Sequence, residues 1–284
     1  YNIGIGGTII VVGAPFKNSY TGAAYIFDLS GNQLGILTGS DSAASDRYGF
    51  SVGVGTDKIV IGAYDHHTDG NADQGQAYIY DHKGANEVKI TGSDSVANDQ
   101  FGYAVGIGAT VIVVSANEAH INGVDGVGKA YIFDLSGTQL GIITASDGAL
   151  QDRFGSDIGV GTSKIVIGAS YDNTGGGFWD EGSAYIYDID GTNEVKITAS
   201  DPSQQAYFGS KVDISGDKIV VGAYRDDDGG SPYDLGAAYI FDLSGNELGK
   251  LLPSDIIAGD EFGGMFVSIE SDQALIGAWE SDST

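Results

Sequence analysis

Residues 101–146 read FGYAVGIGATVIVVSANEAHINGVDGVGKAYIFDLSGTQLGIITAS, and this stretch decides the fold. It contains four short segments separated by Gly, Asn and Asp, at residues 101–108, 110–116, 128–134 and 138–146. The segments are rich in β-branched and aromatic residues, and the third alternates Ala130 and Ile132 with Tyr131 and Phe133. This spacing and composition predict four antiparallel strands and no helix.

The same pattern recurs along the chain. An aromatic-glycine pair begins at residues 48, 101, 154, 208 and 262, and an AYI(F/Y)D segment recurs in step with it. A fixed period near fifty residues indicates repeated supersecondary units. We therefore expect an all-β protein, a β-propeller of four-stranded antiparallel blades, with six blades (seven as the alternative) and an incomplete last blade. We expect one domain over residues 1–284, with repeats at about 1–47, 48–100, 101–153, 154–207, 208–261 and 262–284.

Each strand of the repeat has a composition that suits one place in a blade. The first is Gly-rich, as expected where blades crowd around an axis. The second is apolar throughout, as in Ile59–Ile61, because neighbouring blades would cover both of its faces. The outer strand, NEVKIT at residues 86–91 and 193–198, should point Val and Ile inward and its charges outward. We expect the aromatic of each aromatic-glycine pair, called here the wedge residue, to be buried between blades.

The chain is strongly acidic, with 13 lysines and arginines, 39 aspartates and glutamates, and a formal net charge of −26. A nucleic-acid partner needs a basic face, so this balance argues against one. There is no cysteine, which excludes disulfides and thiolate metal sites. No apolar run approaches the roughly twenty residues that cross a bilayer, so we expect no membrane insertion. Because the sequence begins at Tyr1 without a secretory signal, we expect it to be part of a larger chain or assembly.

The FG pairs at 101–102, 154–155, 208–209 and 262–263, with the GA pairs that follow the apolar strands, resemble the FG-GAP repeat family. This resemblance covers almost the whole chain and implies the β-propeller of integrin α subunits and of bacterial and phage surface proteins. The family's calcium loop lies between the first and second strands, where this chain has only short turns such as GVGTDK, so the family's calcium ligands are not carried over. The sequence stretch DGTNEVKITASD at 190–201 is also similar to repeat proteins of marine bacteria and their tailed phages. This similarity implies a virion or host-contact role.

The connections between the second and third strands vary in length and sequence while the strands stay constant. Binding residues commonly lie on such loops, held by a rigid scaffold. These loops are rich in carboxylates, which are ligands that calcium prefers. Solvated aspartates in turns are the alternative explanation. The candidate calcium ligands are Asp65, Asp69, Asp73, Asp172, Asp180, Asp226, Asp228 and Asp234.

The same loops, or equivalent places, also carry aromatic residues. An exposed tryptophan or tyrosine is a good apolar anchor for a sugar or a protein. The alternative is that Trp179 folds back onto the domain itself. The candidate ligand-binding residues are Phe178, Trp179, Tyr233, Tyr20 and Trp279.

Other patterns give no enzyme signature. His66 and His67 read as surface histidines, and His120 as an isolated one. No Ser-His-Asp group is visible, although the many aspartates leave a glycosidase open. We therefore expect a non-enzymatic recognition or adhesion module, extracellular, on a cell surface or on a phage virion, that binds surface glycan or protein. The alternatives are an architectural domain of a larger surface or phage assembly, and a polysaccharide-acting hydrolase.

Overall fold

A computed structural model describes residues 2–68, 70–174, 179–227, 234–257 and 259–279. The chain divides into two compact units, Tyr1–Ile143 and Thr144–Thr284, and each is described by itself. Apart from one four-residue helical segment, all of the regular secondary structure in the described residues is β-strand, and turns and loops connect the strands. The predicted all-β fold is therefore confirmed. The closed ring, the blade number and the single domain remain predictions.

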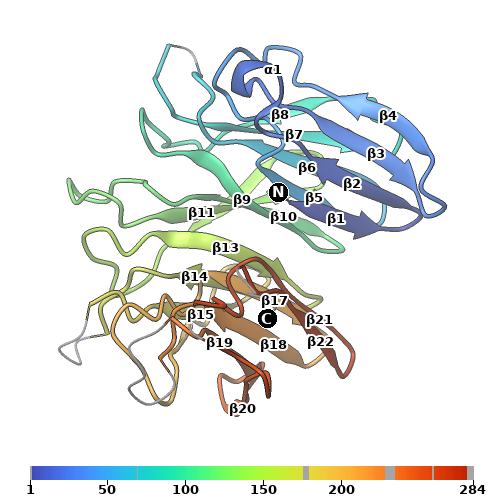
Figure 1. The fold of residues 1–284 in the computed structure, drawn as a ribbon. Helices are drawn as coiled ribbons and strands as arrows, with labels where there is room; N and C mark the ends of the chain where they lie inside the picture. Colours follow the sequence, from blue (N-terminus) through green and yellow to red (C-terminus); the bar gives the residue numbers. More distant parts are fainter. Residues whose placement is uncertain (1, 69, 175–178, 228–233, 258, 280–284) are drawn as a thin grey trace. The chain divides into compact units, whose positions relative to one another are not determined.

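The first unit contains three four-stranded sheets, whose strands run in sequence order from one edge to the other (Figure 1). The first sheet contains β1 (Ile3–Gly6), β2 (Ile9–Gly13), β3 (Ala24–Asp28) and β4 (Gln33–Leu37). The second contains β5 (Ser51–Val54), β6 (Lys58–Ala63), β7 (Gln76–Asp81) and β8 (Val88–Ile90). The third contains β9 (Phe101–Ile107), β10 (Val111–Ala116), β11 (Lys129–Asp134) and β12 (Gln139–Ile143).

The second unit contains two four-stranded sheets and, within the residues described, one two-stranded sheet. The fourth sheet contains β13 (Phe154–Val160), β14 (Lys164–Ala169), β15 (Ser183–Asp188) and β16 (Val195–Ile197). The fifth contains β17 (Lys211–Ser215), β18 (Lys218–Ala223), β19 (Ala237–Asp242) and β20 (Glu247–Leu251). The sixth contains β21 (Val267–Glu270) and β22 (Gln273–Ile276). These sheets are the expected antiparallel propeller blades.

The second strand is buried along almost its whole length in four of the complete blades, and in the first blade Ile10 and Val12 are only partly buried. In the β5–β8 sheet, Ile59, Val60 and Ile61 are all fully buried. The next strand pairs with this one residue for residue, for example Ile59 with Tyr80 and Ile61 with Tyr78. Such pairing places the AYI(F/Y)D side chains alternately on the two faces of the sheet. The prediction that apolar second strands are covered on both faces is confirmed for this sheet.

Four of the five wedge residues, Tyr48, Phe101, Phe154 and Phe208, are fully buried as predicted, whereas Phe262 is only half-buried. Phe208 lies in one apolar cluster with Val166 and Ile186 of the preceding sheet and with Tyr239 of its own. A parallel bridge joins its backbone to Gly182, which precedes β15. Gly182 has a φ of +85°, and a Cβ there would lie 2.1 Å from the Phe208 carbonyl oxygen. Only glycine allows these two backbone segments to approach so closely.

Two local features differ from expectation. On the outer strand of the second blade, Ile90 is buried as predicted, but Val88 is 36% exposed. This strand is only three residues long and lies at the sheet edge, so little covers its first side chain. In the connection between β2 and β3, the segment α1 (Lys17–Tyr20) turns with left-handed backbone at Asn18, Ser19 and Tyr20.

Candidate functional site

A Ser-Asp pair follows the fourth strand of the blades, and we call it the Ser-Asp junction. It occurs at residues 40–41, 93–94, 146–147, 200–201 and 254–255. At the first four junctions the aspartate accepts a hydrogen bond of 2.8–2.9 Å from a tyrosine hydroxyl on the third strand of the following blade. The four tyrosines are Tyr78, Tyr131, Tyr185 and Tyr239. A lysine of that blade also pairs with the aspartate, at 2.6–2.9 Å.

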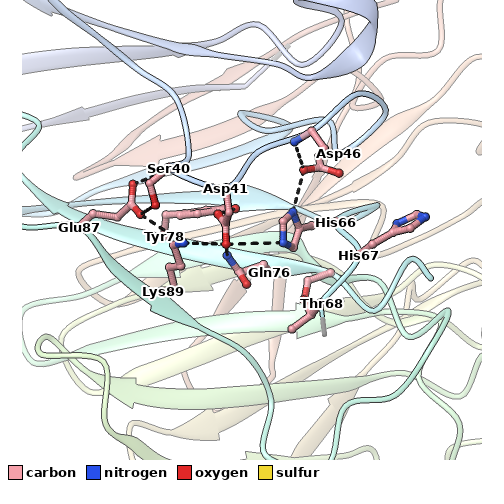
Figure 2. Close-up of polar contacts among 12 residues, drawn as sticks. Ser40, Asp41, Asp46, His66, His67, Thr68, Gln76, Tyr78, Glu87 and Lys89 are labelled. Carbon is pink, nitrogen blue, oxygen red and sulfur yellow. Dashed lines mark hydrogen bonds and ion pairs between the residues drawn. The ribbon is translucent and has the colours of Figure 1, made fainter. Parts of the chain in front are cut away.

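Figure 2 shows the first of these junctions. The Asp41 carboxylate accepts from Tyr78 Oη at 2.9 Å and pairs with Lys89 Nζ at 2.7 Å. Ser40 Oγ donates to Glu87 at 2.6 Å. The junction therefore holds neighbouring blades together through one tyrosine, one lysine and one carboxylate of the next blade.

These contacts keep the junction aspartates ionised. Partial burial alone would raise the pKa of Asp41, but hydrogen bonds from Lys89 and Tyr78 more than offset it and lower the pKa below its ordinary value. The pKa of Asp147 is lowered in the same way, by Lys196 and Tyr185. A lowered folded-state pKa stabilises the fold above the unfolded-state pKa, and this contribution is lost as the pH falls through the folded-state value.

His66 corrects the expectation of a surface histidine. Its imidazole is buried beside the first junction, with Nδ1 2.7 Å from Asp46 Oδ2 and Nε2 3.9 Å from Asp41 Oδ2 (Figure 2). Asp46 is itself buried and accepts from the Ala43 N–H. The adjacent His67 is exposed, as predicted. The two differ because only the His66 ring lies beside Asp41 and Asp46, the carboxylates in the connection between β4 and β5.

His120 is not isolated either. Its Nδ1 lies 3.3 Å from the buried Asp99, which occupies the same place in its repeat as Asp46. The other ring nitrogen lies 3.4 Å from Asp125. Asp99 lies 21 positions before His120, in a different connection, so this partner could not be predicted from local spacing.

Two of the predicted calcium ligands, Asp172 and Asp226, are buried and bind a tyrosine and a lysine of the protein itself. Asp172 is buried, accepts from Tyr185 Oη at 3.1 Å, and pairs with Lys196 Nζ at 2.6 Å. Asp226 is buried in the equivalent place, with Tyr239 Oη at 2.6 Å and Lys250 Nζ at 2.9 Å. Each of these two lysines thus binds both a buried carboxylate and the aspartate of a Ser-Asp junction.

The remaining described candidates have separate contacts, although Asp65 and Asp73 are near enough to interact: burial raises the pKa of Asp65, and the negative charge of Asp73 raises it further. Asp65 pairs with Arg47 at 3.0 Å, Asp73 lies 3.5 Å from His67, and Asp234 lies 3.9 Å from Arg225. The backbone N–H of Asp180 donates to Asn173. Asp69 and Asp228 are outside the described residues. Within the described ranges, no three carboxylates or imidazoles are grouped closely enough to hold a metal ion, and calcium remains a prediction.

The carboxyl group of Asp152 has an unusually high pKa. It is buried, and its burial, with a smaller contribution from the nearby Asp172, raises its pKa to about 6, against the opposing hydrogen bond from the Ala149 N–H. A raised folded-state pKa means that the ionised form is disfavoured in the folded protein. The wild-type chain therefore loses stability at this residue as the pH rises from about 4 to about 6.

Asp152→Asn is expected to stabilise the protein by about 1–2 kcal/mol at pH 7 and by almost nothing at pH 4. The amide oxygen keeps an acceptor for the Ala149 N–H and removes the buried charge. Thermal melting at the two pH values measures the difference. Asp147→Asn is the matched control and should destabilise at pH 7, because the pKa of Asp147 is lowered. An Asp152→Asn variant that melts below the wild type at pH 7 would contradict the assignment.

The predicted aromatic anchors that the structure describes are exposed. Trp179 is 72% exposed, Trp279 61% and Tyr20 50%. The backbone of Trp179 is fixed, since its carbonyl accepts from the Gln205 N–H at 2.7 Å. The anchor hypothesis for Trp179 requires such exposure, and the binding role remains a prediction. Phe178 and Tyr233 lie outside the described residues.

Sequence reasoning missed two groups of arginines and aromatic rings. In the first unit, Arg47 lies 5.9 Å from the Tyr20 ring and 5.2 Å from the Tyr64 ring. In the second, Tyr207 and Tyr224 stack at 5.1 Å, and Arg225 lies within 6 Å of both rings. The signal was present, because Arg47 and Tyr207 both directly precede a wedge residue.

The comparisons with known proteins agree with this architecture. The family model for the FG-GAP repeat matches residues 32–80, 85–133, 138–187, 192–241 and 246–284. No curated protein matches the chain. Among the described residues, no helix has the length and apolarity to span a membrane.

Proposed function

The chain belongs to the FG-GAP repeat family, and from this premise we propose that it is a recognition or adhesion module that binds glycan or protein. FG-GAP repeats are typical of adhesion and recognition propeller domains, which are generally non-enzymatic and extracellular or surface-exposed. The proposed binding surface is the set of connections between second and third strands. On this proposal the protein acts on a cell surface or on a phage virion.

The observation that carries the proposal is the exposure of Trp179. Trp179 exposes 72% of its surface and its carbonyl accepts a backbone hydrogen bond from Gln205, so most of the ring is available to a ligand. Its ring offers a flat apolar face that can stack on a sugar or fill a pocket of a protein partner. A neighbouring acidic group, Asp180, can accept hydrogen bonds from sugar hydroxyls.

Tyr20 supports the same function in the first unit. The left-handed turn of α1 holds it at the surface, with its ring 5.5 Å from Phe16 and 5.9 Å from the Arg47 guanidinium. An exposed aromatic beside a cation suits a ligand with both apolar and acidic groups. Calcium in these loops is part of the proposal, and binding should accordingly be measured in EDTA and in millimolar calcium.

Trp179→Ala is expected to weaken binding to a glycan or cell-surface ligand at least about tenfold, because truncating an anchor residue costs about 2 kcal/mol or more. A glycan array and a cell-binding assay with the fluorescently labelled 284-residue chain provide the ligand and the measurement. Leu248→Ala is the matched control, since Leu248 is also exposed but lies on the outer strand β20. Undiminished binding by the Trp179 variant, with unchanged melting, would refute the anchor role.

An architectural role is the other candidate. The regular Ser-Asp junctions favour it, because the first four of them give neighbouring blades the same aspartate-tyrosine hydrogen bond. Absence of binding to glycan, protein or cells, both in EDTA and in millimolar calcium, would support the architectural role instead.

A further inference from the structure

Three tyrosines of the second unit form a continuous row of rings, called here the tyrosine row. The Tyr207 ring packs edge-on against Tyr171, with centroids 5.0 Å apart, and stacks on Tyr224 at 5.1 Å with the rings 14° from parallel. The Arg153 guanidinium lies 4.4 Å from the centre of the Tyr171 ring, and that of Arg225 lies 5.6 Å from the centre of the Tyr224 ring. A cation at such a distance is attracted to the face of the ring. The tyrosine row thus has an arginine at each end.

Backbone hydrogen bonds hold the exposed Trp179 next to this row. The Gln205 N–H donates to the Trp179 carbonyl at 2.7 Å, and the Arg225 N–H donates to the Ala206 carbonyl at 3.3 Å. Tyr207 directly follows these two acceptor and donor residues in the chain. The segment 205–207 therefore brings the backbone of Trp179, the tyrosine row and Arg225 together at the end of the sheets where the second strands finish.

The equivalent place between the second and third blades has the same backbone contact without the aromatic side chains. Gln100 directly precedes a wedge residue, as Tyr207 does, and its N–H donates to the Asp73 carbonyl at 3.1 Å. Ala72 occupies the position of Trp179. The repeat therefore keeps its backbone hydrogen bonds with a glutamine and an alanine in place of the tyrosine and the tryptophan. Because the fold does not require the rings, contact with a ligand is the better reason for them.

The Arg225 guanidinium has hydrogen-bond donors that the protein does not use. Its side chain is 38% exposed, and Nε lies 3.5 Å from Glu261 and 3.9 Å from Asp234. Neither contact is a hydrogen bond, and Nε has no hydrogen-bond partner among the described residues. Arg47 in the first unit differs, because its guanidinium donates to the Tyr64 hydroxyl. A guanidinium carries five N–H donors in a planar fork, so Arg225 can bind the oxygen atoms of a ligand.

The charge of the chain limits what such a ligand can gain from long-range attraction. With 39 aspartates and glutamates against 13 lysines and arginines, the protein as a whole repels an anion. At physiological ionic strength this repulsion is screened beyond about 8 Å. Glu261 and Asp234 also offset part of the Arg225 charge. Retention of an anionic ligand would therefore depend on direct hydrogen bonds to the guanidinium, which makes it specific.

We propose that Trp179, the tyrosine row and Arg225 form one binding site for a glycan that carries an anionic group, either a carboxylate or a sulfate. This inference rests on the proposed recognition function and names the class of ligand. The Arg225 fork binds two oxygens of the anionic group, a geometry for which arginine is suited. Trp179 and the half-buried rings of Tyr171 and Tyr224 stack on the apolar faces of the sugar rings.

The test uses an array of carboxylated, sulfated and neutral oligosaccharides, probed with the fluorescently labelled 284-residue chain at physiological ionic strength. We expect retention on carboxylated or sulfated members, and the two sets show which anion is bound. Reduction of the carboxylates to alcohols, or removal of the sulfates, should weaken binding of the same oligosaccharide at least about tenfold. Retention on neutral glycans alone would overturn this inference and leave the recognition function standing. Retention on no glycan would also overturn it, whereas the cell-binding assay decides the recognition function separately.

Matched variants show whether the site is the one described. Arg225→Gln should weaken binding of the anionic glycan about tenfold and leave binding of its neutral counterpart unchanged. Arg225→Lys keeps the charge but lacks the planar fork, so it should also weaken binding, by a smaller factor. Lys83→Gln is the control for net charge, because Lys83 is an exposed lysine in the turn between β7 and β8, and affinity should not change. Thermal melting confirms that each variant is folded.

Two outcomes would refute the site. One is an unchanged affinity for the anionic glycan in folded Arg225→Gln or, if that variant does not fold, in Arg225→Lys. The other is a loss in Lys83→Gln as large as that in Arg225→Gln, which would mean that net charge and not the guanidinium retains the glycan.

Discussion

Phe154→Ala is expected to destabilise the protein by about 3–5 kcal/mol, since truncation of a buried phenylalanine leaves a cavity that the surroundings fill only in part. Phe154 is fully buried at the start of β13 and packs edge-on against Tyr185 at 5.4 Å and Tyr187 at 6.1 Å. Such aromatic pairs contribute about 0.5–1.5 kcal/mol each beyond the burial of apolar area. Urea denaturation followed by tyrosine and tryptophan fluorescence measures the change in the free energy of unfolding.

The wedge residue of the sixth sheet supplies the matched control. Phe262 has the same repeat position but is half-buried and has no ring partner among the described residues. Phe262→Ala should therefore cost about 1–2 kcal/mol, as for partial loss of apolar burial. Equal losses for the two variants, or a loss below about 1 kcal/mol for Phe154→Ala, would show that the wedge residues do not stabilise the blades as described.

Lys196→Met is expected to cost about 2–3 kcal/mol, because it leaves a buried carboxylate without its cation. Lys196 Nζ lies 2.6 Å from both Asp147 and Asp172, and the Asp172 side chain is only 6% exposed. Methionine keeps much of the apolar stem while removing the charge. The lysine itself is 27% exposed, so the expected loss is smaller than for a fully buried pair. Chemical denaturation at pH 7 gives the measurement.

Lys89→Met tests whether the burial of the ion pair, and not only the loss of a charge, determines how much stability is lost. Lys89 pairs with Asp41 at 2.7 Å in the first junction, but both side chains are more than a third exposed. Exposed ion pairs contribute about 0–1 kcal/mol, so this variant should lose less than 1 kcal/mol. If Lys89→Met proved as harmful as Lys196→Met, solvent exposure would not be what distinguishes the two junctions.

The strands and wedge residues could be predicted from the sequence because each depends on local pattern, and the pattern is repeated. The apolar second strand at Ile59–Ile61 and the wedge at Phe208 are examples. The wedge position has the same buried surroundings in four of its five copies, and Phe262 is the exception. Local pattern failed at Val88, where the alternation was correct but the three-residue edge strand left the side chain exposed.

The candidate site was harder to predict because its contacts join residues that are far apart in sequence. Asp41 and Tyr78 are 37 positions apart, and Asp46 and His66 are 20 apart. The Ser-Asp pair was visible as a repeated dipeptide, but nothing in its own sequence indicates that its partners lie on the following blade. The same limit applies to Asp172, whose negative charge suggested a calcium ligand before the lysine beside it was known.

The junctions have a further consequence for how such a chain can change in evolution. Each of the first four junctions joins a repeat to the one that follows, and the tyrosine lies 37 or 38 positions after the aspartate in each of them. Unequal recombination that gains or loses one whole repeat would therefore recreate an equivalent boundary, while a gain or loss of a large fraction of a repeat would separate the aspartate from its tyrosine. Genes of this kind can thus vary in copy number far more readily than in repeat length.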